Sequence, residues 1–182
     1  MLKIPLDQEL VLETERVKLE PTRDIHAKEI IKLFQEVKLF EYIPREPRSD
    51  LEKLEVVYKK RQSKISPNKD EIWLNWIGRE KTNNIIIGEF EATIYKDFHV
   101  DIAYMIDQPF QQKGYGFEVL QEIIKFLIES LNLTSIQAYI DTRNKASIKL
   151  VKKLGFIQIK YIKDADEFKG NKSDEYLFQL KR

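Results

Sequence analysis

The chain has 182 residues, 42% of them apolar and 34% charged, which is typical of one globular domain with a sizeable core and excludes a disordered chain. Its 31 lysines and arginines nearly balance its 30 aspartates and glutamates, so its charge favours neither nucleic acid nor a membrane as a partner. The absence of cysteine excludes disulfides, thiolate metal sites and a cysteine nucleophile.

The same absence fits a reducing, cytoplasmic location, which we expect for this protein. The first ten residues do not predict a signal peptide, and no apolar run approaches the roughly 20 residues that span a bilayer. His26 and His99 lie far apart, which disfavours a histidine zinc site, and we expect no metal.

The first part of the chain predicts one strand and two helices. Residues 11–20 alternate weakly between apolar and polar side chains, as a strand does, and Pro21 ends them. Residues 24–40 carry an apolar stripe at helical spacing. Two prolines exclude a continuous helix over residues 41–49, and the highly charged residues 50–63 predict the second helix.

The middle of the chain predicts three consecutive strands. Residues 71–79 and 85–95 are rich in β-forming side chains, and residues 81–84 between them predict a turn. Residues 98–106 predict the third strand, whose alternating side chains point to opposite faces. One face carries Val100, Ile102, Tyr104 and Ile106, and the other carries Asp101, Ala103 and Met105.

The last part alternates helices and strands. A polar loop over residues 108–116 precedes an amphipathic helix over residues 115–131. The remaining elements are strands at residues 135–140, 156–162 and 176–180, a helix at residues 144–154, and a polar excursion at residues 163–174. This order predicts a single α/β (α+β) domain over residues 1–182, with a mixed sheet of about seven strands and about four helices on its faces.

Residues 111–116, Gln-Gln-Lys-Gly-Tyr-Gly, lie between a predicted strand and a long predicted helix. The first turn of a helix has about four backbone N–H groups without internal partners and carries partial positive charge. Glycines there let a phosphate approach the backbone closely. The spacing therefore suits a diphosphate cradle, although two glycines before a helix also occur in ordinary turns. The segment is neither a Walker A loop nor the full dinucleotide fingerprint.

Five segments, in order, resemble the GNAT superfamily of N-acetyltransferases, specifically its ribosomal-protein-alanine acetyltransferase-like branch. Gln111, Gly114 and Gly116 fit the family's pyrophosphate loop, Gln/Arg-x-x-Gly-x-Gly/Ala. The other four segments are residues 12–21 (containing Thr-Glu-Arg), Ile87-Gly88, Ile102-Ala103-Tyr104, and residues 144–156 (Asn-Lys-Ala-Ser to Leu-Gly-Phe). The resemblance covers about residues 10–160 and implies a single-domain GNAT fold with acetyl-CoA as co-substrate.

The resemblance also implies where CoA would bind. The diphosphate would lie on the backbone N–H groups of Gln112, Lys113, Gly114, Tyr115 and Gly116. The pantetheine arm would pair with the strand near Met105 and Ile106, and the thioester would enter where that strand separates from residues 135–140. Asn144 would contact the pantetheine or guide the amine, and asparagine is equally suited to capping the helix that begins there.

Forming an amide from a thioester requires a neutral amine, a stabilised oxyanion and a protonated or solvated thiolate. Asp101 is a candidate base, and Glu89 and Glu91 on the neighbouring predicted strand are its rivals. The resemblance implies that Ser147 is the partner of the CoA sulfur. Many members of the superfamily carry a tyrosine that acts as general acid seven residues after the asparagine, but this chain has Val151 there. Tyr104, Tyr139 and Tyr115 remain as alternative acids, although each also suits a packing role.

The leading hypothesis is an enzyme that transfers acetyl from acetyl-CoA to a primary amine, directly within a ternary complex, as a monomer or homodimer. The acceptor would be a protein N-terminal amine or a small-molecule amine. Residues 40–42, Phe-Glu-Tyr, lie where this family places its acceptor-binding wall, and aromatic and acidic side chains suit a cation. One alternative is a non-catalytic acyl-CoA-binding module, which Val151 favours, and another is a nucleotide-binding protein.

Overall fold

The computed structural model describes residues 9–181. The strands are β1 (Leu12–Glu13), β2 (Val17–Pro21), β3 (Glu71–Glu80), β4 (Ile85–Tyr95), β5 (His99–Ile106), β6 (Ser135–Asp141), β7 (Ile157–Phe168) and β8 (Asn171–Lys181). The α-helices are α1 (Ala27–Phe34), α2 (Leu51–Arg61), α3 (Tyr115–Ser130) and α4 (Lys145–Lys153). Short 3-10 turns cover Asp24–His26, Val37–Phe40 and Gln108–Phe110.

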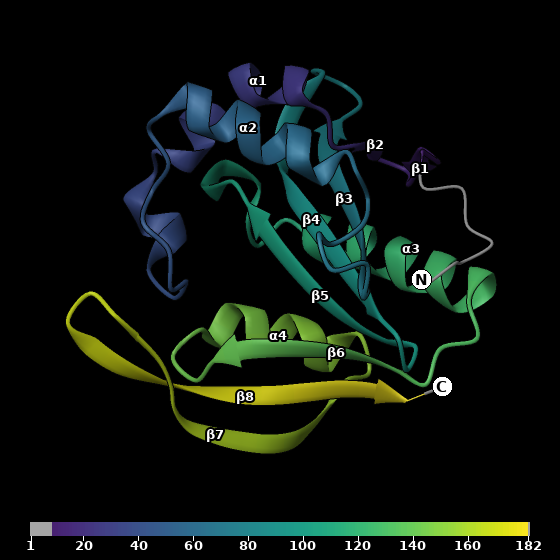
Figure 1. The fold of residues 1–182 in the computed structure, drawn as a ribbon, viewed down its shortest axis with the longest axis vertical. Helices are drawn as coiled ribbons and strands as arrows, with labels where there is room; N and C mark the ends of the chain where they lie inside the picture. Colours follow the sequence, from purple (N-terminus) through teal and green to yellow (C-terminus); the bar gives the residue numbers. More distant parts are fainter. Residues whose placement is uncertain (1–8, 182) are drawn as a thin grey trace.

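The strands form one sheet in the order β1-β2-β3-β4-β5-β6-β8-β7 (Figure 1). All neighbouring strands are antiparallel except β5 and β6, which are parallel. The predicted mixed sheet with four helices is confirmed, with eight strands in the described chain. Within residues 9–181, no helix is long and apolar enough to span a bilayer.

The helices cover both faces of the sheet. On one face, Phe34 of α1 and Leu54 and Tyr58 of α2 are buried in a cluster with Ile77 of β3. On the other face, α3 and α4 pack on the larger core cluster, to which α4 contributes Val151. The stripe of α3 in this cluster consists of Val119, Leu120, Ile123, Ile124, Phe126 and Leu127. Burial of each such side chain stabilises the fold by about 1.5–3 kcal/mol, which holds α3 firmly against the sheet.

The continuous helix predicted over residues 24–40 is wrong. The α-helix α1 ends at Phe34, and the chain then turns through the 3-10 segment Val37–Phe40. This turn brings Phe40 back onto Phe34, with ring centroids 6.3 Å apart in an edge-on contact, and both rings are buried. Tertiary packing of two aromatic rings thus outweighs the helical spacing of the sequence.

The polar excursion predicted over residues 163–174 is also wrong, because β7 and β8 form one long hairpin there. Phe168 faces Asn171 across a two-residue turn, in which Lys169 and Gly170 have φ values of 52° and 71°. Positive φ at both turn residues suits the right-handed twist of a hairpin. The end of this hairpin projects beyond the body of the molecule (Figure 1), so its side chains do not follow a core-facing apolar pattern.

The single strand predicted over residues 11–20 is interrupted. A bend separates β1 from β2, and there Thr14 Oγ1 and the backbone N–H of Arg16 both donate to Glu118 of α3, at 2.5 and 2.8 Å. These side-chain contacts replace strand pairing and attach the bend to the first turn of α3.

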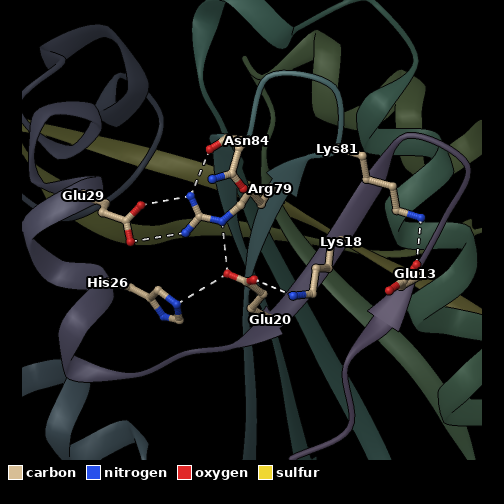
Figure 2. A network of polar contacts seen from close by, with 8 residues as sticks. All are labelled: Glu13, Lys18, Glu20, His26, Glu29, Arg79, Lys81 and Asn84. Atoms are coloured by element: carbon tan, nitrogen blue, oxygen red, sulfur yellow. Dashed lines mark hydrogen bonds and ion pairs between the residues drawn. The ribbon is translucent and has the colours of Figure 1, made fainter.

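A polar network joins α1 to the sheet, and Figure 2 shows it around Arg79 of β3. The guanidinium donates to Glu20 of β2 at 3.1 Å, to Glu29 of α1 at 2.9 Å and to the Asn84 carbonyl at 3.1 Å. His26 is buried beside this network and places Nε2 3.6 Å from Glu20. Because Arg79 is itself buried, these partners are needed to offset its desolvation.

Candidate active site

The loop before α3 has the geometry of an anion cradle. Gly114 precedes the helix with a φ of 87°, in the left-handed region that glycine adopts without strain. The first helical hydrogen bond runs from the Glu118 N–H to the Gly114 carbonyl, so the amides of the preceding turn have no partner within the helix. Gln112 and Lys113 are exposed beside them. Solvent-accessible N–H groups at a helix N-terminus favour a phosphate.

Gln111 and Arg16 hold this loop in place. Gln111 Nε2 donates to the carbonyl of Ile106, the last residue of β5, at 2.8 Å. Arg16 Nη1 donates to the Lys113 carbonyl at 3.1 Å, and its guanidinium lies 4.2 Å from the centre of the Tyr115 ring. Arg16 also pairs with Glu118 at 2.6 Å. No local pattern in the sequence predicts this role for Arg16, although it lies in the Thr-Glu-Arg segment that carries the resemblance.

The strands β5 and β6 separate over the part of β5 that leads into this loop. They pair only at His99–Ser135, Val100–Ile136 and Asp101–Gln137, although both strands continue well beyond. Figure 1 shows the two strands close together at one end and diverging toward the other. The separation predicted from the resemblance is therefore present, and it exposes one edge of β5 to an extended ligand.

A cavity of about 250 Å³ lies at this separation. Its walls include Ala103, Tyr104 and Met105 of β5, residues 138–141 of β6, and Asn144 and Ser147 at the start of α4. Phe40 and Tyr42, from the predicted acceptor wall, line it as well, whereas Glu41 does not. The structure thus joins the predicted pantetheine edge, the α4 residues and two of the predicted acceptor residues in one space.

Two carboxylates from β4 face this cavity. Glu89 and Glu91 both line it, since residues two apart on a strand point to the same face. Arg61 of α2 pairs with both, reaching Glu91 Oε1 at 2.6 Å. Burial, and then the charge of Glu91, raise the pKa of the Glu89 carboxyl above its usual range. A carboxylate with a raised pKa is a better proton acceptor near neutral pH.

Asp101, the third candidate base, lies away from the cavity. It pairs across the sheet with Thr93 and Gln137, at the last step before β5 and β6 separate, and does not line the cavity. Burial raises its pKa, and its Oδ1 is buried without a hydrogen-bond partner in the described chain. The geometry therefore favours Glu89 and Glu91 over Asp101.

Ser147 and Asn144 meet at the first turn of α4. Asn144 Oδ1 accepts from the Ser147 N–H at 3.0 Å, so Asn144 caps this helix. The Ser147 hydroxyl lies 2.6 Å from the Tyr104 hydroxyl, a contact between residues 43 apart that no local sequence pattern predicts. Burial raises the pKa of Tyr104 to about 12, so this phenol stays protonated at neutral pH. Val151 is fully buried in the core, so it offers no polar group to the cavity.

The sequence matches the family described as "Acetyltransferase (GNAT) domain" over residues 16–157. The chain is 34% identical over 102 residues to "Uncharacterized N-acetyltransferase p20" of Bacillus licheniformis, covering 55% of this chain and 57% of that protein. It is 31% identical over 116 residues to the "[Ribosomal protein uS5]-alanine N-acetyltransferase" of Escherichia coli (strain K12), covering 64% of this chain and 54% of that protein. The chain thus spans little more than half the length of these relatives.

Among solved structures, the fold is similar to that of a spermidine N-acetyltransferase from Vibrio cholerae "in complex with CoA and spermine". The TM-score is 0.78 at 17% identity, over 91% of this chain and 95% of that chain, which shows likeness of fold alone. The family match covers most of the chain and includes the loop, the separated strands and α4. The protein belongs to the GNAT acetyltransferase family.

Proposed function

We propose that the protein transfers the acetyl group of acetyl-CoA to a primary amine, directly within a ternary complex. The separation of β5 and β6 is the observation that carries this proposal. The cavity with Glu89 and Ser147 lies at this separation, and the anion cradle follows the end of β5 along the chain. A thioester and an amine could therefore meet in this space.

The residues present fit CoA. The amides of residues 112–116 would hold the diphosphate, Lys113 would add a positive charge, and the free edge of β5 near Met105 and Ile106 would pair with the pantetheine. Acetyl-CoA supplies the activated acyl group when bound. The chain's part is to place that group where the amine arrives.

We propose that Glu89 accepts the proton of the incoming ammonium, directly or through a water. Tyr104 and Ser147 form a hydrogen-bonded pair that would donate a proton to the departing thiolate. This pair stands in for the tyrosine that Val151 replaces, which weakens the case for a non-catalytic module. That module remains the second candidate, because the buried Arg61 pairs with both carboxylates and would make them structural.

The acceptor is an amine on a protein N-terminus or a small molecule. The relatives named for uS5 alanine and spermidine represent one of each kind. A chain α-amine has an ordinary pKa of about 7.7–8.0 and a side-chain ammonium about 10.4, so the α-amine needs less help from a base. A cytoplasmic location, and a monomeric or homodimeric state, stay predictions.

An acceptor screen that measures released CoA tests this proposal. The chain contains no cysteine, so a thiol-reactive chromogenic reagent will detect CoA without a background from the protein. We expect amine-dependent release with at least one peptide or small amine, with product mass raised by one acetyl group. Tight acetyl-CoA binding with no transfer to any amine would favour the non-catalytic module.

A further inference from the structure

Arg48, an arginine that forms no ion pair among residues 9–181, lies in the wall of the cavity. Its Nη1 is buried with no hydrogen-bond partner among residues 9–181. In the same part of the chain, no carboxylate lies within ion-pair distance of its guanidinium. Arg61 of α2 differs in this respect, since it pairs with Glu89 and Glu91.

The position of Arg48 is fixed by the end of α1. Its backbone N–H donates to the Phe34 carbonyl at 2.9 Å, and its guanidinium lies 5.5 Å from the centre of the Phe34 ring. Phe34 itself is buried in the cluster beneath α1 and α2. The fold therefore holds this cation at the cavity instead of letting it extend into solvent, as a surface arginine would.

Both signs of charge line the cavity, with Arg45 and Arg48 on one side of the balance and the carboxylates Glu89, Glu91, Asp141 and Glu175 on the other. Glu89 and Glu91 pair with Arg61 and Asp141 pairs with Arg143, whereas no carboxylate among residues 9–181 forms an ion pair with Arg48. Burial, and then the charge of Arg61, lower the pKa of Arg48, and the charge of Glu89 offsets this lowering only in part. A partly desolvated guanidinium without a directly paired counter-ion destabilises the protein, and an anion bound beside it would offset that cost.

We propose that Arg48 binds an anionic group of the acceptor, a carboxylate or a phosphate, and so selects amines that also carry a negative charge. This inference rests on the proposed acetyl transfer. Guanidinium groups bind both anions in a two-pronged geometry. Arg48 would repel the further positive charge of a polyamine, which the carboxylates elsewhere in the cavity would attract.

Competing peptides test the preference. We would compare four peptides that differ only in the N-terminal residue. The pair with Asp or Asn tests a carboxylate against its neutral counterpart, and the pair with phosphoserine or Ser tests a phosphate. We expect the wild-type protein to favour at least one anionic peptide over its counterpart by about 10-fold or more in kcat/KM, because charge-assisted hydrogen bonds are strong. Equal kcat/KM values within both pairs would overturn the proposal.

Arg48→Met keeps much of the side-chain length without the charge. It should bring the ratio of kcat/KM for the anionic peptide to kcat/KM for its neutral counterpart close to one. Lys53→Met removes one positive charge from an exposed position on α2 and should keep the wild-type ratio. The melting temperature of Arg48→Met should equal or exceed that of the wild type, since the variant removes an unpaired cation. An anionic preference that survives in a folded Arg48→Met protein would contradict the assignment.

A binding measurement distinguishes this inference from the proposed function. Calorimetric titration of the CoA-loaded protein with N-acetylated Asp, Asn, phosphoserine and Ser peptides requires no turnover. We expect an anionic product to bind about 10-fold tighter than its neutral counterpart in the wild type but not in Arg48→Met. If the anionic and neutral products bind equally well and acetyl transfer is measurable, the role of Arg48 is contradicted and the proposed function stands. If the anionic product binds more tightly but no acetyl transfer occurs, only the proposed reaction is contradicted.

Discussion

At the scale of single residues, the carboxylates of β4 decide the proposed proton transfer. Glu89 is buried beside the cavity, whereas Asp101 pairs with Thr93 and Gln137 outside it. Sequence position alone left Asp101, Glu89 and Glu91 as rivals, because all three are strand carboxylates. The distinction depends on where β5 and β6 stop pairing, which no local pattern of side chains specifies.

Glu89→Gln tests this assignment. We expect kcat/KM for the amine to fall by about 10²-fold while acetyl-CoA affinity changes little. Because the pKa of Glu89 is raised, its basic form is lost as pH falls through that raised pKa, so the wild-type rate should fall on the acid side. That acid limb should be missing in the variant. Glu91→Gln is the matched control, and an equal loss in both variants would indicate a structural role for the pair.

The Tyr104–Ser147 pair gives a second prediction at this scale. Tyr104→Phe and Ser147→Ala should each lower kcat by about 10²-fold with little change in the KM for acetyl-CoA. The double variant should lose no more than the worse single variant, because the two hydroxyls act together. Steady-state kinetics of the three proteins measures this coupling. Wild-type turnover in Ser147→Ala would remove Ser147 from the mechanism.

At the scale of elements, the loop and its flanking strand and helix follow closely from the sequence. The glycine spacing at residues 111–116 correctly predicted the loop, because backbone freedom determines where a chain can turn. The apolar stripe correctly predicted α3, because local periodicity determines a helix of this kind. Strands were predicted at residues 156–162 and 176–180, but their extension through residues 163–174 escaped prediction, since most side chains there are not buried and the two strands are set by pairing with each other. Arg16 escaped for a similar reason, because its partner Glu118 lies 102 residues away.

Gly116 tests the cradle as an element. A Cβ there would lie 2.8 Å from Ile106 Cδ1 and 3.0 Å from Leu150 Cδ2, both flexible ends of side chains. Gly116→Ala should therefore cost roughly 1–3 kcal/mol by overpacking, partly offset by about 1 kcal/mol of helix propensity. Gly116→Asp adds negative charge at the predicted diphosphate position and should abolish CoA binding.

Calorimetry and thermal melts of both variants separate these effects. Gly116→Ala supplies the steric control, and it should still bind CoA. Unchanged CoA affinity in a folded Gly116→Asp protein would contradict the loop assignment.

At the scale of the whole molecule, the Arg79 network links α1 to the sheet and makes stability depend on pH (Figure 2). His26 Nδ1 accepts from the Arg23 N–H at 3.0 Å, which requires a neutral ring nitrogen. Burial lowers the pKa of His26, outweighing the attraction of Glu20 and Glu29, while Arg79 and Arg23 lower it further. The neutral ring is thus the form that the fold stabilises.

Acid titration of stability tests this network. A lowered folded pKa gives stability that is present above the unfolded value of about 6.5 and is lost as pH falls below it. We expect His26→Asn, whose amide oxygen can accept the same backbone N–H, to lose less free energy of unfolding than the wild type as the pH falls below about 6.5. Urea unfolding at several pH values measures the difference, and parallel curves for both proteins would exclude His26 as the titrating group.

Binding of acetyl-CoA tests the central claim most directly. Calorimetric titration of the wild-type chain, with ATP as the control ligand, asks whether the cradle and the separated strands accept the co-substrate as a unit. We predict saturable binding of acetyl-CoA at about one site per chain, and no binding of ATP. A folded protein that fails to bind acetyl-CoA, or that binds ATP equally well, would contradict the assignment of this site.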